Sequence, residues 1–285
     1  MATLRDIKNR IKSIKNTEQI TRAMKMVSAA KFRRAQEMAL AGREYYHHVS
    51  NITRSLAGLA GSGAHPLFRQ GDESEIDLIL FTSDKGLCGS FNSYLIKKAL
   101  IFMEEKSSTR VTLIPVGKKG RDFFKRQDLE MAGEFLDISR SIGLPLAREI
   151  AAKALERLGT GQAQATYVIY SRFISALNQK PEVFRLFPIP PAPPEEMPAV
   201  EYLYEPSREA VIRKFIPLYT DIVMNQALWE STASEQGSRM TAMDTATKNA
   251  GELIEQLNLY YNKARQAAIT KELIEVVSGA DALEG

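Results

Sequence analysis

The fold of this chain is decided by its N-terminal stretch, LRDIKNRIKSIKNTEQITRAMKMV, residues 4–27. Apolar side chains recur there in steps of three or four, the period of a helix with one apolar stripe. The stripe continues onward and comprises Leu4, Ile7, Ile11, Ile14, Ile20, Met24, Val27, Tyr45, Val49, Ile52, Leu56 and Leu59. No proline interrupts it, and the only glycines are Gly42 and Gly58. We therefore predict one helix of roughly 80 Å, at about 1.5 Å per residue, that ends at Gly61-Ser62-Gly63.

The C-terminal part of the chain has the same pattern. Ser207, after Glu205-Pro206, is a predicted helix N-cap, and Pro217 is expected to kink or restart the helix. No further proline occurs up to Val277, which predicts a second helix of roughly 90 Å. Because an isolated helix gains little net stability in water, we predict that the two helices pair as an antiparallel coiled coil.

The middle of the chain has the sequence pattern of an α/β domain. Short apolar runs predict strands at 76–82, 111–116, 166–170 and 183–187, and helical patterns alternate with them at 91–106, 121–127 and 146–158. This alternation favours a largely parallel, Rossmann-like sheet inserted between the long helices. Residues 188–194, PIPPAPP, are interpreted as a stiff polyproline connector. The predicted domains are residues 1–60, 75–205 and 206–285, of which the first and last are the two long helices of the coiled coil.

Composition excludes several classes of protein. The chain has 285 residues, 44% of them hydrophobic, but no apolar stretch approaches the roughly 20 residues that span a bilayer. Its N-terminus lacks the apolar core of a secretory signal. A single cysteine, Cys88, excludes an internal disulfide framework, and three histidines argue against a histidine-built metal centre. His47 and His48 are adjacent on a helix and point apart, so we interpret them as solvated or stacked.

Positive charge is concentrated at the N-terminus. Up to Arg34 there are ten Lys and Arg residues against only Asp6 and Glu18, whereas the rest of the chain has four more acidic than basic residues. This basic arm has three readings: a solvated helix face, a nucleic-acid-binding surface, or an electrostatic bearing against acidic protein loops. Nucleic acid would favour interleaved aromatics, and Phe32 is the only one before Tyr45. The pattern alone does not separate the last two readings.

Two glycine-containing turns lie where a nucleotide-binding fold would hold phosphate, residues 83–92 and 117–120. Neither matches GxxxxGK[ST] or GxGxxG, so tight turns that need glycine conformations are the favoured interpretation. Cys88 lies in the first turn with no identifiable base, which favours a structural thiol.

Residues 231–251 are rich in Ala, Ser, Thr, Gly and Met and poor in the Glu/Lys pairs that make free coiled coils soluble. Small residues permit a close approach of helices. Alternatively, this face is covered by another protein, as exposed apolar patches usually are. Both readings stay open.

Four stretches closely resemble the gamma subunit of F-type ATP synthases. Residues 14–31, IKNTEQITRAMKMVSAAK, resemble its N-terminal helix; residues 234–243, SEQGSRMTAM, and 261–273, YNKARQAAITKEL, resemble its C-terminal signature. Residues 83–89, SDKGLCG, resemble the central motif of the family. These motifs are long and specific, and the resemblance covers essentially the whole chain in order.

The resemblance implies a central-stalk rotor shaft that transmits torque between a proton-driven membrane ring and the catalytic beta subunits, so that ATP is made from ADP and phosphate. It implies no cofactor and no catalytic residue in this chain, since catalysis would reside on the beta and alpha subunits. The implied partners are the alpha and beta subunits, the epsilon subunit and the ring of c subunits, without nucleic acid. Shaft residues expected to face the alpha/beta ring are Met24, Lys25, Gln236, Arg239, Arg265, Gln266 and Thr270.

The expected location is peripheral, at the cytoplasmic face of a bacterial inner membrane, because no transit peptide precedes the first helix. Two alternatives remain. A nucleic-acid-binding protein with a basic coiled-coil arm predicts steeply salt-dependent affinity for nucleic acid. A nucleotide-dependent enzyme that uses the α/β domain alone predicts saturable nucleotide binding to the isolated chain.

Overall fold

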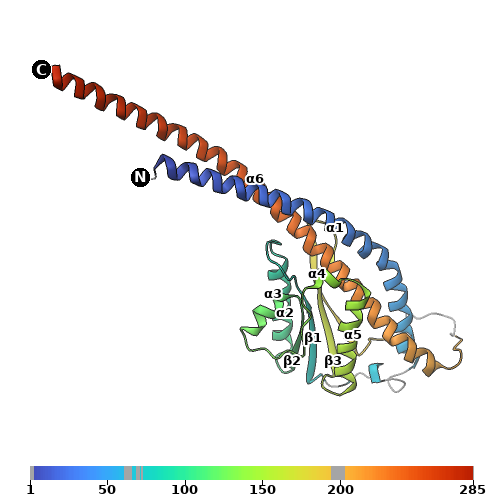
Figure 1. Ribbon diagram of the computed structural model, residues 1–285. Coiled ribbons are helices and arrows are strands. Elements are labelled where there is room, and N and C mark those ends of the chain that lie inside the picture. The colour runs from blue at the N-terminus through green and yellow to red at the C-terminus, as the bar shows by residue number, and fades with distance from the viewer. Residues whose placement is uncertain (1–2, 61–65, 69–70, 72, 194–202, 285) are drawn as a thin grey trace. The chain divides into compact units, whose positions relative to one another are not determined.

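The computed structural model describes residues 3–60, 66–68, 71, 73–193 and 203–284 (Figure 1). Its elements in chain order are α1 (Leu4–Ala60), the 3₁₀ helix η1 (Pro66–Phe68), β1 (Glu75–Phe81), α2 (Phe91–Glu105), β2 (Arg110–Val116), α3 (Lys118–Lys125), α4 (Ile138–Ser141), α5 (Leu144–Gly159), β3 (Ala165–Phe173), β4 (Gln179–Phe187) and α6 (Arg208–Glu284). Long helices at both ends and a central α/β sheet confirm the predicted fold class.

The chain divides into two compact units. Met1–Val27 and Met240–Gly285 form the first, here called the paired-helix unit, and Ser28–Arg239 form the second, here called the sheet unit. The predicted domains 1–60, 75–205 and 206–285 assign each helix wholly to the shaft. In the structure, both long helices are instead shared between the two units.

The predicted N-terminal helix is present as one continuous 57-residue element. Thr3 caps it: its Oγ1 accepts the N–H of Asp6 at 3.3 Å, and the Asp6 carboxylate accepts the N–H of Thr3 at 3.0 Å. This reciprocal pair satisfies two donors at the helix start. The pKa of Asp6 is lowered chiefly because the Thr3 hydroxyl also donates to its carboxylate at 2.7 Å, and further by the bond from the Thr3 N–H. The helix ends at Ala60, and the predicted Gly61-Ser62-Gly63 terminator lies outside the described residues.

The second helix begins where predicted, with the Ser207 hydroxyl accepting the N–H of Ala210 at 3.2 Å. It does not restart at Pro217, which lies inside the continuous α6. Proline removes one helical hydrogen bond. That loss is offset here because Ile212, Ile216 and Tyr219, on either side of Pro217, are buried in the core of the sheet unit.

The sheet has the order β2-β1-β3-β4. β1 pairs in parallel with both β2 and β3, whereas β3 and β4 pair antiparallel. A parallel pair needs a long crossover, and only residues 174–178 separate β3 from β4, so these two strands form a hairpin. The predicted largely parallel sheet is therefore a mixed one with an antiparallel edge strand.

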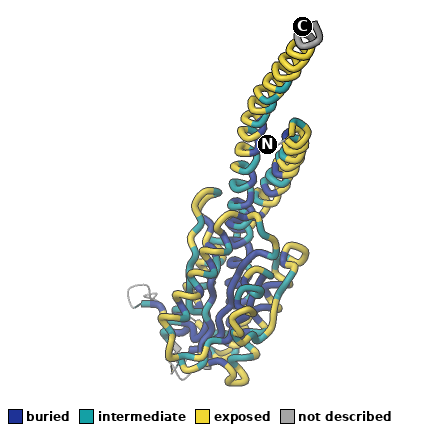
Figure 2. Tube along the Cα trace, turned by 90° about the vertical axis from the view of Figure 1, so that its left-hand side faces the viewer, coloured by how far each residue is buried: buried dark blue, intermediate teal, exposed yellow. Residues whose placement is uncertain are grey.

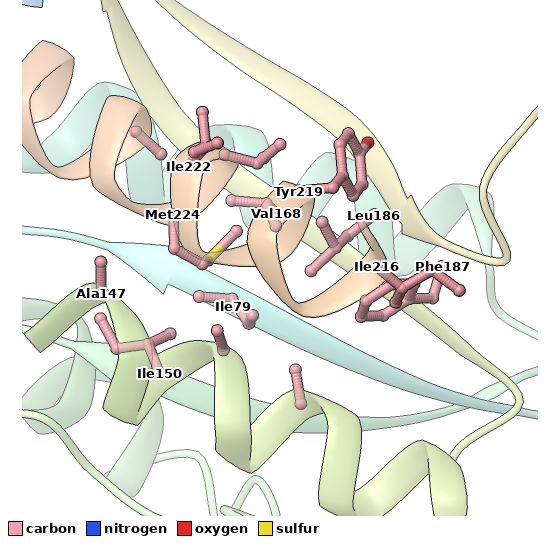
Figure 3. Packing of buried hydrophobic residues seen from close by; sticks show 14 of the residues in the cluster. Ile79, Ala147, Ile150, Val168, Leu186, Phe187, Ile216, Tyr219, Ile222 and Met224 are labelled. Carbon is pink, nitrogen blue, oxygen red and sulfur yellow. The ribbon is translucent and has the colours of Figure 1, made fainter. Parts of the chain in front are cut away.

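Alternation along β1 divides the core of the sheet unit between two faces. Ile76, Leu78 and Leu80 pack with α2 and α3, while Ile79 and Phe81 pack with α5 and the first turns of α6. Figure 3 shows the second face, where Ile79, Val168 and Leu186 of the strands meet Ile150 of α5 and Met224 of α6.

Some local predictions differ from the structure. α3 begins at Lys118 rather than Arg121, α4 was not predicted, and β4 begins at Gln179 and contains Pro181, which an edge strand tolerates. The predicted connector at 188–194 is docked rather than free. Ile189 is buried and donates its N–H to the Leu67 carbonyl, and Ala192 donates to the Arg54 carbonyl. Pro194 lies outside the described residues.

The paired-helix unit is antiparallel, as predicted. Lys25 of α1 donates to Asp244 of α6. The Thr21 hydroxyl, one turn earlier in α1, accepts a hydrogen bond from Thr247, which lies later in α6 than Asp244. Residue numbers thus fall along α1 as they rise along α6. Figure 2 shows that the C-terminal part of α6 is mostly exposed.

Candidate interaction surface of the long helices

Lys25 is held by an ion pair within the paired-helix unit. Its Nζ lies 2.6 Å from the Asp244 carboxylate, whose other oxygen is 3.0 Å from Nζ of Lys248. The hydrogen bond from Lys25 is the largest cause that lowers the pKa of Asp244. Lys25 and its neighbour Met24 are both half-buried. Asp244 was missed by sequence reasoning, although its i, i+4 spacing to Lys248 is a visible signal.

The exposed surface of α1 in this unit combines cations with aliphatic side chains. Arg5, Lys8, Arg10, Lys12 and Lys15 are all exposed. So are Ile20, Met26 and Val27, at 60%, 62% and 57% of their full area. A basic surface with bare aliphatic groups and no aromatics suits an acidic protein partner better than stacked bases.

An open groove of about 390 Å³ lies between the helices of this unit. Its lining residues are Lys15, Glu18, Gln19, Arg22, Gly251, Ile254 and Glu255. Glu18 and Arg22 form an ion pair at 2.9 Å. The two cationic side chains that line the groove are thus matched in number by two carboxylates, those of Glu18 and Glu255. Without excess charge the groove is not an anion site.

Arg265, Gln266 and Thr270 lie together on an exposed part of α6. The Thr270 hydroxyl donates to the Gln266 carbonyl at 2.9 Å, whereas the side chains of Arg265 and Gln266 project from the helix. Large apolar side chains surround them and are half exposed or more: Ile269, Leu273, Ile274, Val276 and Val277. We call residues 265–277 the apolar tip. A helix surface of this kind is typically covered by a partner.

Gln236 and Arg239 belong to the sheet unit and are only 6% and 7% exposed. Arg239 Nη1 lies 2.6 Å from the Glu235 carboxylate, and Nη2 donates to the Lys85 carbonyl at 3.0 Å. Gln236 donates to Glu235 at 3.2 Å. Burial raises the pKa of Glu235, and Arg239 opposes that rise. Both predicted contact residues therefore serve contacts within this chain.

The small residues of 231–239 are likewise covered by the chain itself. Ser231, Ala233 and Ser234 are 7%, 0% and 0% exposed, and a Cβ on Gly237 would lie 3.3 Å from the Ala176 backbone. Close packing within the chain thus accounts for the small residues that are buried here, whereas Thr232 and Ser238 keep part of their surface exposed.

The turns at 83–92 and 117–120 leave no phosphate cradle at the start of α3. Its first three N–H groups are taken by Asp84 Oδ1 at 3.3 Å, the Ser83 carbonyl at 3.0 Å and Thr82 Oγ1 at 2.9 Å. Asp84 also accepts the N–H groups of Asp137 and Ile138. A carboxylate of this chain therefore stands where a nucleotide fold would place phosphate.

Cys88 is buried beside Asn92, whose Nδ2 is 3.1 Å from the sulfur, and Ser83, whose Oγ is 3.7 Å away. Burial raises the pKa of the thiol, which keeps it protonated and unreactive. Neither neighbour is a base. The structure therefore agrees with a structural thiol.

Two further observations concern sites that the sequence argued against. In the described part of the chain, no group of three His, Cys, Asp or Glu side chains is arranged to bind a metal ion. His47 and His48 are exposed, with the His47 ring stacked edge-on to Tyr46.

Among the helices that the structure describes, none combines the length and the apolar character that crossing a membrane requires.

Comparisons with known proteins cover the full length. A family model described as ATP synthase matches residues 3–283. The chain is 45% identical to the ATP synthase gamma chain of Pelotomaculum thermopropionicum and 44% identical to that of Anaeromyxobacter sp. strain Fw109-5, with 100% of both chains covered in each case.

Solved structures agree in fold. The chain resembles one from the central stalk and c-ring of the Tetrahymena thermophila mitochondrial ATP synthase, with 29% identity, a TM-score of 0.63 and coverage of 80% of this chain and 99% of that one. A chain of the Euglena gracilis mitochondrial ATP synthase matches with a TM-score of 0.69 at 22% identity, over 98% of this chain and 94% of that one.

Proposed function

The chain belongs to the ATP synthase gamma-chain family, and from this premise we propose that it is the central-stalk rotor of an F-type ATP synthase. The observation that carries the proposal is the antiparallel helix pair with its basic N-terminal surface and its bare apolar tip. Such a pair is stiff along its axis, and its exposed side chains require a surrounding partner.

In this role the chain carries torque and no catalytic group. Rotation driven at the membrane ring of c subunits turns the shaft, which changes the nucleotide sites of the beta subunits in sequence. Support comes from the start of α3, where the N–H groups that would bind phosphate already have partners in this chain.

We assign the contact with the alpha/beta ring to Met24, Lys25, Arg265, Gln266 and Thr270, together with the apolar tip. These side chains are half-buried or exposed. The exposed cations of α1 suit acidic loops on the ring. Gln236 and Arg239 contribute through contacts inside this chain. The sheet unit is then the part that meets the epsilon subunit and the c ring, at the cytoplasmic face of a bacterial inner membrane.

Reconstitution tests the proposal. Alpha and beta subunits of a related bacterium, prepared without their gamma chain, are mixed with this chain, its epsilon subunit and the membrane sector in vesicles. We expect ATP hydrolysis coupled to proton pumping, and loss of coupling when the chain ends at residue 264. The matched control, Lys271→Gln, changes charge without removing the tip. Stable binding to RNA with a steep salt dependence, and no effect on the subunits, would establish the nucleic-acid alternative instead.

A further inference from the structure

Strand β3 extends beyond the neighbour that pairs with it. Its parallel register with β1 ends at Leu80 opposite Ile169, and β1 itself ends at Phe81, after which Thr82 donates its N–H to Val116 of β2. β3 continues to Phe173. Since alternate residues of a strand direct their backbone groups to the same side, Ser171 and Phe173 face the edge that β1 has vacated.

Side chains of α6 take the place of the missing strand. Ser231 Oγ accepts the Ser171 N–H at 3.1 Å, and Ser234 Oγ donates to the Ser171 carbonyl at 3.2 Å. Glu230 Oε2 accepts the Phe173 N–H at 2.6 Å. All three side chains are buried, at 7%, 0% and 3% exposure.

Arg43 of α1 completes this end of the contact. It donates to the Phe173 carbonyl and forms an ion pair with Glu230 at 2.7 Å. The ion pair and its hydrogen bonds leave the carboxylate of the buried Glu230 fully matched. Two long helices and one strand end are thus joined at a single carboxylate.

The same face of α6 continues onto the turn between β1 and α2. Ser238 Oγ donates to the Cys88 carbonyl at 2.7 Å, and Arg239, paired with Glu235, donates to the carbonyls of Lys85 and Gly86. The residues involved recur in steps that keep one side of a helix facing its neighbour: Glu230, Ser231, Ser234, Glu235, Ser238 and Arg239. We call this set the polar stripe.

We propose that the polar stripe is the torsional joint of the rotor, which fixes the rotation of α6 about its own axis relative to the sheet. Hydrogen bonds to backbone groups are directional, whereas aliphatic contacts tolerate sliding and rotation. Torque that enters through the sheet unit therefore reaches the helix partly through these bonds, in addition to the apolar packing of residues 212–228 of α6 in the core of the same unit. The joint rests on the proposed rotor function, and its members are positioning residues.

Two variants loosen the joint with little change of shape: the double variant Ser231→Ala/Ser234→Ala, and Glu230→Gln. The control is Thr232→Ala, which removes a hydroxyl from the same helix outside the stripe. In the full-length chain we expect the Ser171 and Phe173 amides to exchange with solvent about tenfold faster, as for the loss of one buried hydrogen bond. The control should leave both rates unchanged.

The decisive measurement is the number of protons pumped per ATP hydrolysed by the assembled complex in vesicles. If the stripe is the joint, both loosened variants hydrolyse ATP while this ratio falls below that of the parent and of Thr232→Ala. A merely stabilising contact would change the amount of complex and leave the ratio unaltered. Faster exchange with an unchanged ratio overturns the joint. If the parent chain itself gives no coupled activity, the proposed rotor function is wrong instead. If the double variant does not assemble, the proton-to-ATP ratio of Glu230→Gln alone tests the joint.

Discussion

Replacing Arg157 with methionine tests how the sheet unit tolerates a buried charge. The Arg157 Nε lies 2.8 Å from the Asp77 carboxylate, and the two side chains are 12% and 0% exposed. Arg157 is at the end of α5 and Asp77 is in the central strand β1, so the pair joins helix to sheet. Methionine keeps the apolar stem but leaves the carboxylate unpaired. Breaking such a pair costs about 3–5 kcal/mol, and we expect the lower end because Lys153 is near.

The loss should depend on pH, with a definite sign. Burial raises the pKa of Asp77 above 3.8, and Arg157 opposes that rise. A folded chain with a raised carboxyl pKa holds its proton to higher pH than the unfolded chain, so the stability from this site is present below 3.8 and lost as pH rises through the folded pKa. Without Arg157 the folded pKa rises further. The deficit of the variant should therefore be small in acid and grow towards neutral pH.

Urea unfolding measures this directly through Trp229, the only tryptophan of the chain, which is 6% exposed in the sheet unit. We expect Arg157→Met to lose about 3 kcal/mol at pH 8 and clearly less at pH 5. Asp77→Asn, the matched control, keeps an acceptor for Arg157 and should lose about 1 kcal/mol or less at both pH values. Equal losses for Arg157→Met at the two pH values would refute the reasoning.

Three further predictions follow from positions with well-defined surroundings. Gly117→Ala places a Cβ in collision with the Thr82 carbonyl oxygen at a φ of +105°, so we expect a loss of about 3 kcal/mol or more in the same urea assay, and a change within the error of the parent would contradict the clash. Gly251→Ala meets nothing within 4 Å in the interior of α6 and should stabilise the helix by about 1 kcal/mol in thermal unfolding followed by circular dichroism; destabilisation would indicate that the groove closes over this position. Calorimetric titration of the isolated chain with Mg-ATP should reveal no saturable site, because Asp84 occupies the start of α3, and tight one-to-one binding that Lys85→Ala or Gly86→Ala abolishes would count against this account.

The long helices could be predicted because their signal repeats over many turns, so a single exception such as Pro217 hardly weakens it. The strands were found for a related reason: buried runs such as 76–81 are almost entirely apolar, with Asp77 as the single charged exception. The start of α3 was not found, because Gly117 and Gly120 indicate a turn, whereas the acceptors for its first N–H groups come from Thr82, Ser83 and Asp84, directly after β1. That information lies 34 to 38 residues away in the chain.

The surroundings of the candidate contact residues could be inferred from the sequence for some of them only, for the same reason. Met24 and Arg265 lie on helix surfaces that periodicity can identify, and they are half-buried and exposed, respectively. Arg239 looks equally available in the sequence, but its partners are the carbonyls of Lys85 and Gly86, which no local pattern brings to it. Glu230 escaped notice because a lone glutamate on a helix gives no sign of the strand end that it binds.

The internal position of the Asp84 carboxylate has a consequence for how such a protein works in a cell. A rotor of this family turns in a solution crowded with ATP, ADP and phosphate, and its α/β domain has the topology of folds that commonly bind them. Here the negative charge is covalently part of the chain, held by the N–H groups of Lys118, Asp137 and Ile138. A carboxylate tethered at these N–H groups acts at a high effective concentration, so we expect dissolved phosphate groups to compete poorly for this position. In such a rotor, ATP, ADP and phosphate would then act on the shaft through the subunits around it and not at this turn.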